Sequence, residues 1–295
     1  MIRAALMHIP DEFSEHVSQR VGDDAAGWLD ALPATFERLF ELWELTGVGQ
    51  PTHGDVGLVI PVRTRSLAAV IKFTYPDELF TAESRWLQTH ADTQSVVDVY
   101  DVDFESGALL LEHLTEPNLW AVPAIEAARV VGQLHRDTLL PDDGSYPDLS
   151  NRYQPGVLVE SNDDLGSPFP SDVAKRADLT AGHLLDSRDL AVVNEDLYSS
   201  HVRTAVGGGW KLSDPRPVVG EAAYGLFPFL VDRWDNLAVP PEDVVSAAAP
   251  GLHEPRVYGW ILVHAVEYGL WAYRSGYVGD ANRARRIAAW ALSSF

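Results

Sequence analysis

The sequence predicts an α+β fold, with strands gathered in the first third of the chain and helices in the remainder. Two apolar runs within residues 56–75, separated by a polar turn at 63–66, indicate a pair of antiparallel strands. Beyond residue 123, apolar residues recur mostly at helical spacing. The glycine run Gly207-Gly208-Gly209 separates two short strand-like segments, and glycine there permits the positive φ of a tight hairpin.

The N-terminal part is predicted to form helices and then strands. Residues 23–46 carry Phe36, Leu39, Phe40 and Trp43 at i, i+3, i+4 and i+7, the spacing of an amphipathic helix. Pro33 suits the first turn of that helix, where its missing N–H would have no partner anyway, and a shorter helix is expected before it. The later strands are expected at 96–100 and 108–111, and a helix at 77–90 precedes them.

The C-terminal part is predicted to be mostly helical around one hairpin. An irregular connection rich in Pro, Gly, Asp and Ser is expected at 141–170, since these residues favour turns. Ser171 and Asp172 are expected to cap the helix that follows. The elements of this part are expected at 123–140 (helix), 171–187 (helix), 190–193 (strand), 201–214 (hairpin), 255–275 (helix) and 280–294 (helix).

Composition limits the classes of protein to consider. The chain has 295 residues, 46% of them hydrophobic, which suits one large or two modest domains with a full core. It has no cysteine, which excludes disulfides, iron–sulfur clusters and thiolate zinc sites. The N-terminus has no long apolar run, and no apolar run elsewhere is long enough to span a bilayer. A cytoplasmic location is expected.

The chain is strongly acidic, with a formal net charge of −21. This argues against nucleic acids and anionic membranes as partners, because both require a positive protein surface. A cationic small-molecule substrate is compatible with this charge. A generally acidic surface that serves solubility alone is the favoured explanation, because net charge bears on solubility and steering rather than on a site. The sequence does not indicate an oligomeric state.

Two aspartates flank the predicted hairpin. Asp196 precedes it and Asp214 follows it, so a ribbon that folds back can bring both carboxylates into one site. Such a pair suits phosphoryl transfer, in which one carboxylate orients or deprotonates the acceptor hydroxyl and the other holds Mg²⁺ on the nucleotide phosphates.

At these residues the chain resembles the aminoglycoside phosphotransferase family, most closely the branch of streptomycin 6-kinases and hydroxyurea kinases. That branch carries His-Gly-Asp-Leu-His-x-x-Asn, a hairpin, and then Gly-Trp-x-x-Ile-Asp-Pro followed by Gly-Glu. Residues 194–201 here read Asn-Glu-Asp-Leu-Tyr-Ser-Ser-His, and residues 209–215 read Gly-Trp-Lys-Leu-Ser-Asp-Pro, with Gly220-Glu221 beyond. The second motif is nearly intact. The first keeps its aspartate, while Asn194, Glu195 and His201 replace the His, Gly and Asn.

The resemblance implies a two-lobed protein-kinase-like fold. It would have a small N-lobe at 1–114, with a helical extension and a nucleotide-covering antiparallel sheet. A larger, mostly helical C-lobe at 115–295 would carry the catalytic loop and the substrate pocket. It further implies a role for each matched residue, with ATP or GTP and Mg²⁺ bound: Asp196 as the catalytic base, Lys72 on the phosphates, Glu83 holding Lys72, Glu112, His113 and Leu114 at the adenine through their backbone, and Asp214 with His201 as metal ligands.

The altered first motif leaves two functions open. One is a kinase that transfers the γ-phosphate to a hydroxyl of an aminoglycoside-like substrate, at a rate lowered by His201, since Mg²⁺ prefers oxygen ligands. Glu195 is expected to add negative charge beside Asp196, which would raise a carboxylate pKa or repel nucleotide. The alternative is a non-catalytic kinase-like binding protein, a pseudokinase, that uses the same cleft. The loop at 49–57 could cover phosphate, but Asp55 is unfavourable there and the Walker motif is absent.

Overall fold

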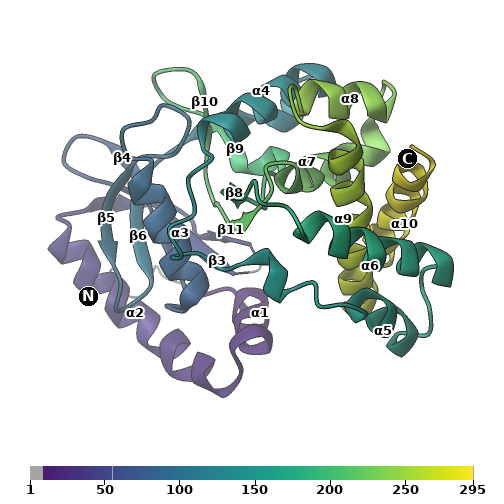
Figure 1. Cartoon of the computed structure of the whole chain (residues 1–295). Helices are drawn as coiled ribbons and strands as arrows, with labels where there is room; N and C mark the ends of the chain where they lie inside the picture. The colour runs from purple at the N-terminus through teal and green to yellow at the C-terminus, as the bar shows by residue number, and fades with distance from the viewer. Residues whose placement is uncertain (1–8, 55, 295) are drawn as a thin grey trace. The chain divides into compact units, whose positions relative to one another are not determined.

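An antiparallel sheet with the order β1-β3-β4-β6-β5 organises the N-terminal unit of the chain, and β2 pairs with β3 outside this path. The computed structural model describes residues 9–54 and 56–294 (Figure 1). The strands of this sheet are β1 (Thr46–Val48), β2 (Thr52–His53), β3 (Gly57–Arg63), β4 (Ala68–Thr74), β5 (Val99–Asp103) and β6 (Ala108–Glu112). The four strand segments predicted from the sequence are thus present as β3, β4, β5 and β6, although β5 begins three residues later than expected, at Val99.

Every second side chain of β3 points into the core of the N-terminal unit. Leu58, Ile60 and Val62 of β3 are 0%, 1% and 4% exposed, as expected for every second residue of a strand with one buried face. These side chains share one core cluster with apolar residues of the two N-terminal helices, among them Phe36. The pairing places Val59 opposite Lys72, and Leu109 opposite Lys72 on the other side.

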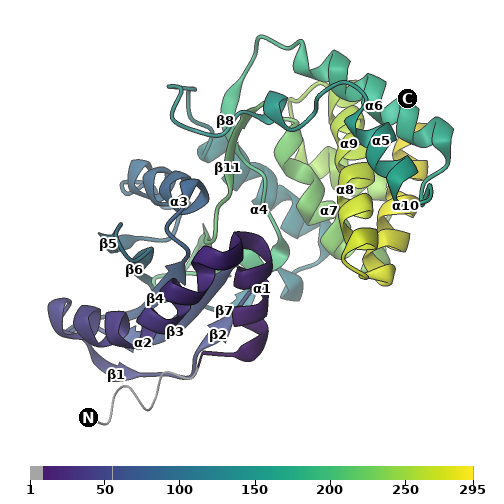
Figure 2. The ribbon, with the colours of Figure 1, turned by 90° about the horizontal axis from the view of Figure 1, so that it is seen from below.

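The N-terminal helices lie beside this sheet as α1 (Asp11–Val21) and α2 (Ala25–Leu42) (Figure 2). The prediction that Pro33 opens a helix is wrong, because Pro33 lies inside α2. The break falls at Gly22 instead, where a φ of 82° and a cap bond from its N–H to the Ser18 carbonyl end α1. The buried face of α2 runs without interruption from Ala25 to Phe40, which keeps the helix continuous through the proline.

The helix expected at 77–90 is present as α3 (Glu78–Thr89). Asp77 is its N-cap: its side chain accepts hydrogen bonds from the N–H groups of Leu79 and Phe80 at 3.0 and 3.2 Å. Such a cap satisfies donors that the first helical turn leaves without partners. α3 therefore begins at a fixed residue directly after β4, which sets the position of Glu83 on it.

Helices dominate the second unit. Chain contacts divide the molecule into Met1–Thr115 with Ala205–Gly207, and Glu116–Thr204 with Gly208–Phe295. The helices of the second unit are α4 (Ala124–Asp137), α5 (Val157–Asp164), α6 (Ser171–Leu185), α7 (Phe227–Arg233), α8 (Pro241–Ala248), α9 (Glu254–Arg274) and α10 (Val278–Ser293). None of the helices within 9–54 and 56–294 has both the length and the apolar character needed to cross a membrane.

Two sequence expectations for this unit need correction. The connection at 141–170 is not irregular throughout, because it contains α5 and a short 3-10 turn at Leu149–Asn151. α6 begins at Ser171 as expected, but its N-cap is Pro170 and no side chain caps it. The helices predicted at 123–140, 255–275 and 280–294 are present as α4, α9 and α10.

Two small antiparallel sheets complete the second unit. β8 (Ala191–Asn194) pairs with β11 (Pro217–Gly220), and the hairpin strands β9 (Val202–Thr204) and β10 (Trp210–Leu212) pair with each other. β9 also pairs with β7 (Thr115–Asn118). The predicted hairpin is therefore present, and its ends return to a second strand pair that the sequence did not indicate.

Candidate active site

The strand pairs bring the two hairpin aspartates together. Asp196 follows β8, and Asp214 follows β10. The strands β9 and β10 pair antiparallel, with Val202 opposite Leu212. Just beyond this pair, the Ser213 N–H donates to the His201 carbonyl at 2.8 Å. The loop that follows β8 and the loop that follows β10 therefore meet, as the sequence predicted.

Asp196, His201 and Asp214 form one cluster. Each offers a ligand atom that lies within 4.8 Å of the others. His201 lies between the carboxylates, with Nδ1 3.5 Å from the Asp196 Oδ2 and Nε2 3.7 Å from the Asp214 Oδ2. All three side chains keep part of their surface in water.

The backbone of the loop orients the His201 ring. His201 Nδ1 lies 2.9 Å from the Asp196 carbonyl oxygen, a distance at which Nδ1–H donates. Nε2, the other ring nitrogen, is the atom that faces Asp214. Histidine ligands to metals usually donate their other ring N–H to such an acceptor, so the ring is set up to offer Nε2 to a cation.

Asp214 adopts an unusual backbone conformation. Its φ is 57°, in the left-handed region that residues other than glycine rarely occupy. Aspartate tolerates this region better than most residues because its side chain is short and polar. The chain therefore turns directly after β10, at Asp214.

Asn194 holds the two loops to one another. Its side-chain Oδ1 accepts the N–H of Asp196 at 3.0 Å and the N–H of Arg216 at 2.8 Å. Asn194 is 1% exposed, so water does not compete for this oxygen. Sequence reasoning assigned Asn194 no role, although asparagine often accepts the N–H two residues ahead of it.

Glu195 does not add an uncompensated charge to the site. Arg152 binds both its carboxylate oxygens, at 2.6 and 2.9 Å, and the Tyr224 hydroxyl donates to it at 3.1 Å. Burial would raise the pKa of Glu195, but the hydrogen bonds and charge of Arg152 outweigh burial and lower it. The expectation that Glu195 repels nucleotide rests on a charge that the structure shows to be neutralised.

The pKa of Asp196 is raised to about 6. Burial is the largest cause, and the neighbouring Asp214 adds to it, while the nearby His201 acts in the opposite direction. Glu195 also raises this pKa, as expected, but it is the smallest of the causes. A carboxylate with such a pKa is still mostly ionised at neutral pH and is a stronger base than an ordinary aspartate.

In the N-terminal unit, Lys72 and Glu83 form a buried ion pair. Lys72 Nζ lies 2.5 Å from Glu83 Oε1, and the two side chains are 6% and 7% exposed. A Cβ on Gly57 would lie 3.0 Å from Lys72 Cε, so the glycine at the start of β3 makes room for the lysine. Asp55, expected to disfavour phosphate in the preceding loop, lies outside the described residues.

Two of the three residues expected at the adenine use their N–H groups within the sheet. Glu112 N–H donates to the Asp98 carbonyl at 2.9 Å, and His113 N–H donates to the Ala68 carbonyl at 3.4 Å. A nucleotide base would therefore meet the carbonyl oxygens of this segment, or the backbone of Leu114, which follows them.

Three acidic residues of the second unit, Asp232, Asp235 and Glu267, have partners of their own. The Asp232 carboxylate accepts the Ser199 N–H at 2.9 Å and so fixes the loop after Asp196. Asp235 pairs with Arg283 at 2.8 Å. Glu267 accepts a hydrogen bond from the Tyr153 hydroxyl.

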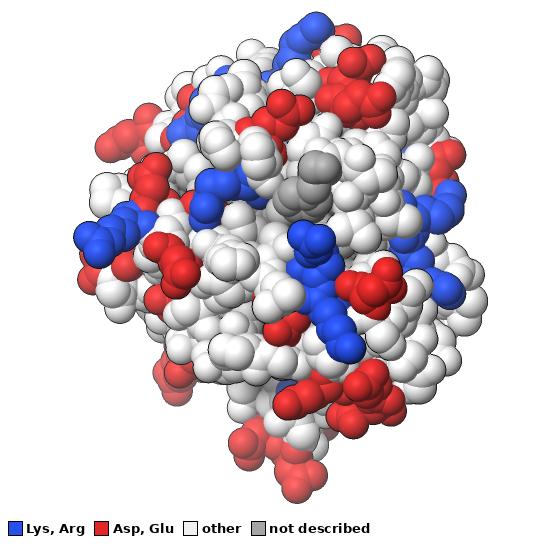
Figure 3. All heavy atoms as spheres, turned by 45° about the vertical axis from the view of Figure 1, so that its right-hand side comes forward, with Lys and Arg blue, Asp and Glu red and all other residues white. Residues whose placement is uncertain are grey.

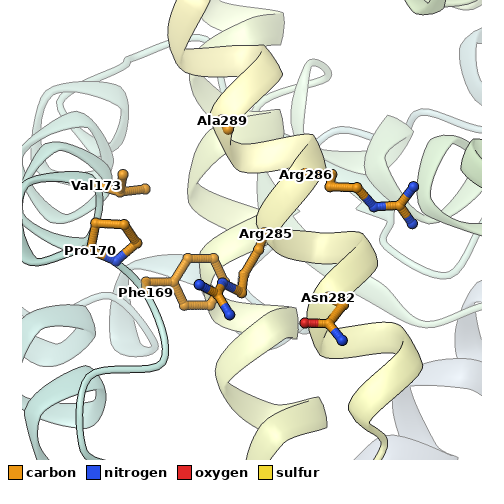
Figure 4. Close-up of a pocket in the computed structure, with 7 residues that line it drawn as sticks. All are labelled: Phe169, Pro170, Val173, Asn282, Arg285, Arg286 and Ala289. Atoms are coloured by element: carbon orange, nitrogen blue, oxygen red, sulfur yellow. The ribbon is translucent and has the colours of Figure 1, made fainter.

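A hollow in the second unit lies apart from these residues. It has a volume of about 500 Å³ and is lined by the start of α6 and one side of α10. Figure 4 shows Arg285 reaching toward Phe169 in this hollow, while Arg286 points away. The hollow contains none of the site residues predicted from the sequence.

The surface is as acidic as the composition indicates. Figure 3 shows acidic side chains spread over one face, with the basic side chains standing among them in small groups. A field of this sign attracts cations.

Comparison with known proteins identifies similar sequences over nearly the whole chain. A family model described as aminoglycoside/hydroxyurea antibiotic resistance kinase matches residues 42–276. Streptomycin 6-kinase of Streptomyces glaucescens is 30% identical over 300 residues, which cover 94% of each chain. Hydroxyurea phosphotransferase of Kitasatospora aureofaciens is 28% identical over 96% of this chain and 86% of its own.

Solved structures share the fold at low sequence identity. Choline kinase LicA from Streptococcus pneumoniae has a TM-score of 0.62 at 16% identity, covering 89% of this chain and 98% of its own. Aminoglycoside phosphotransferase APH(4)-Ia, in a ternary complex with AMP-PNP and hygromycin B, has a TM-score of 0.60 at 14% identity. That match covers 88% of this chain and 97% of the other. The kinase-like α+β fold predicted from the sequence is confirmed.

Proposed function

This chain belongs to the aminoglycoside/hydroxyurea antibiotic resistance kinase family, and from that premise we propose that it transfers the γ-phosphoryl group of ATP or GTP to a hydroxyl of an aminoglycoside-like substrate. The family makes the chain a small-molecule phosphotransferase, and the alternative of a non-catalytic binding protein is not favoured. The observation that carries the proposal is the cluster of Asp196, His201 and Asp214 at the ends of the hairpin.

Asp196 would act on the acceptor. Its carboxylate would orient the hydroxyl and accept its proton as the oxygen attacks phosphorus. The raised pKa supports this role, because proton transfer is most effective when the pKa of the base lies near the working pH. General-base help of this kind contributes roughly 10²–10⁴ in rate.

Asp214 and His201 would hold a divalent cation. The donor set fits one, since an imidazole nitrogen and a carboxylate oxygen face each other at 3.7 Å. A bound cation would neutralise charge on the phosphates during transfer. Mg²⁺ prefers an all-oxygen environment, whereas imidazole suits softer transition metals such as Zn²⁺. Mn²⁺ is a transition metal that also accepts carboxylate and water ligands. We expect Mn²⁺ to support this chain at least as well as Mg²⁺.

Lys72 would bind the nucleotide phosphates, and Glu83 would keep it extended for that purpose. The backbone of Glu112, His113 and Leu114 would receive the adenine, through the carbonyl groups and through Leu114, because the N–H groups of the first two are used in the sheet. These roles rest on the family and on the buried pair.

The substrate is proposed to be cationic. Two relatives are named streptomycin 6-kinases, and the net charge of −21 favours a positively charged ligand. The reaction would consume a nucleoside triphosphate. These compounds are abundant in the cytoplasm, which supports a cytoplasmic location. The same negative charge disfavours nucleic acids and anionic membranes as partners.

A nucleotide-consumption screen tests the proposal. The purified chain is incubated with ATP or GTP, with Mg²⁺ or Mn²⁺, and with streptomycin, other aminoglycosides, other amino sugars or hydroxyurea. Mass spectrometry then shows whether the acceptor has gained one phosphoryl group. Asp196→Asn should abolish most of the transfer. The matched control is Asp235→Asn, which removes an aspartate of the same unit that pairs with Arg283.

Two results would overturn the proposal. One is the absence of calorimetric binding of Mg·ATP or Mn·ATP, which would restore the non-catalytic alternative. The other is nucleotide consumption that proceeds equally with and without any acceptor.

A further inference from the structure

A buried polar network adjoins the catalytic loop on the side of Glu195. Arg152 binds the two carboxylate oxygens of Glu195 and also donates to the Tyr224 hydroxyl at 2.9 Å. The Glu195 side chain is only 6% exposed, whereas the Arg152 side chain keeps 34% of its surface in water. The Arg216 side chain adds a third contact, from Nε to Glu195 at 3.2 Å.

The network fixes the backbone immediately before Asp196. Glu195 and Asp196 share one peptide bond, so holding the Glu195 side chain at both oxygens limits how that peptide can turn. The Glu195 N–H also donates to the Arg216 carbonyl at 3.0 Å. Glu195 is thus held at its backbone and at both ends of its carboxylate.

The segment that carries Arg152 is itself anchored. It follows the 3-10 turn Leu149–Asn151, and just before that turn the Val219 N–H donates to the Pro147 carbonyl at 2.7 Å. Val219 lies in β11, which pairs with β8, the strand that leads into Glu195. The segment before Arg152 is bonded to β11, and Glu195 directly follows β8. The contact between Arg152 and Glu195 therefore links two segments that are both attached to the β8–β11 pair.

Glu195 stands where the resembled motif has a glycine. Because glycine has no side chain, a contact with Arg152 is possible only in a chain with a residue such as glutamate at this position. We propose that Arg152 and Glu195 form a positioning pair, which sets the orientation of Asp196 toward the acceptor without touching the substrate. The inference rests on the proposed function, since it assigns a role within that site. Arginine is required, because its planar fork binds two oxygens at once and a lysine cannot.

The test compares two arginines in similar settings. Arg256 also binds a buried carboxylate, Glu221, at 2.7 and 2.9 Å, and its side chain is 33% exposed. Arg256→Met and Arg152→Met should each lower the melting temperature. If Arg152 positions Asp196, only Arg152→Met should lower kcat, by about 10-fold or more, with the KM for nucleotide and acceptor within about two-fold of wild type.

Further variants separate positioning from folding. Arg152→Lys keeps the charge and should fold well, yet it should recover only part of kcat. Glu195→Gln should lower kcat like Arg152→Met, and the double variant should lose little more than either single variant, because both remove the same contact.

A second readout does not depend on activity. Amide hydrogen exchange in residues 194–201 should be faster in Arg152→Met than in wild type and unchanged in Arg256→Met. If the wild-type chain transfers no phosphoryl group, the proposed function fails, and the exchange data still decide whether the pair holds the loop.

Three outcomes would overturn the positioning pair. Arg152→Met and Arg256→Met could have the same kcat. Arg152→Met could raise the KM of the acceptor with kcat intact, which would make Arg152 a substrate ligand. The exchange rates of residues 194–201 could be equal in the two variants.

Discussion

Replacing Asp196 with asparagine should make the protein more stable while nearly removing its activity. Asparagine has almost the same shape as aspartate but carries no charge and cannot accept the hydroxyl proton. We expect kcat to fall roughly 10²–10⁴-fold. The stability gain arises because the folded protein disfavours the ionised form of Asp196, as its raised pKa indicates.

The magnitude follows from the pKa. The rise from 3.8 to about 6, at 1.36 kcal/mol for each pKa unit, corresponds to at most about 3 kcal/mol. The Asp196 side chain keeps 28% of its surface in water, so screening reduces the expected gain to about 1–2 kcal/mol.

The size of this stability gain depends on pH. Because the folded pKa lies above the unfolded one, the folded state holds this proton more tightly, and its contribution to stability is complete below pH 3.8. That contribution is lost as the pH rises through about 6. The difference in unfolding free energy between variant and wild type should therefore be small at acid pH and full at neutral pH.

Guanidinium unfolding, followed by tryptophan fluorescence in the presence of a chelator, measures this difference at two pH values. Asp235→Asn serves as a control of opposite sign, since hydrogen bonding to Arg283 lowers the pKa of Asp235. That variant should lose stability at neutral pH. The reasoning is refuted if Asp196→Asn is less stable than wild type at neutral pH, or if it keeps most of its kcat.

Three further predictions concern single residues. His201→Asn should shift the ion preference from Mn²⁺ toward Mg²⁺, because an amide oxygen is the harder ligand; Mn²⁺ binding measured by electron paramagnetic resonance checks this, and an unchanged affinity contradicts it. Lys72→Met should weaken nucleotide binding in calorimetry while acceptor binding stays the same, and equal losses of both would count against its role. Gly225→Ala should destabilise the protein by about 1–3 kcal/mol, because the added Cβ would lie 2.6 Å from the Asn194 carbonyl oxygen. Gly182→Ala in α6, with open space around it, should instead be neutral or stabilising. Thermal denaturation of the two variants measures the difference, and equal losses of stability would contradict the prediction.

The elements that the sequence predicted well have strong local signals. The strands β3 and β4 carry long apolar runs, and the N-cap Asp77 is the first residue of the range expected for its helix. The contact between Lys72 and Glu83 was expected from the family resemblance and not from local patterns, and its role on a nucleotide stays a prediction.

The elements that the sequence missed have weak local signals. α1 buries only Phe13 and Val17, too few apolar residues for a helical pattern to stand out. β11 is four residues long and contains one proline. The partner of Glu195 was missed for a different reason. Arg152 lies 43 residues earlier, in a segment whose turns hide its contacts until the chain is folded.

The presence of Glu195 where the family motif has glycine has a consequence for evolution. A glutamate introduced alone would leave a buried charge, so the substitution at 195 could be tolerated only together with, or after, an arginine at 152. Among relatives, glutamate at this place should occur with arginine in the turn before α5, and lineages that have glycine should be free to vary there.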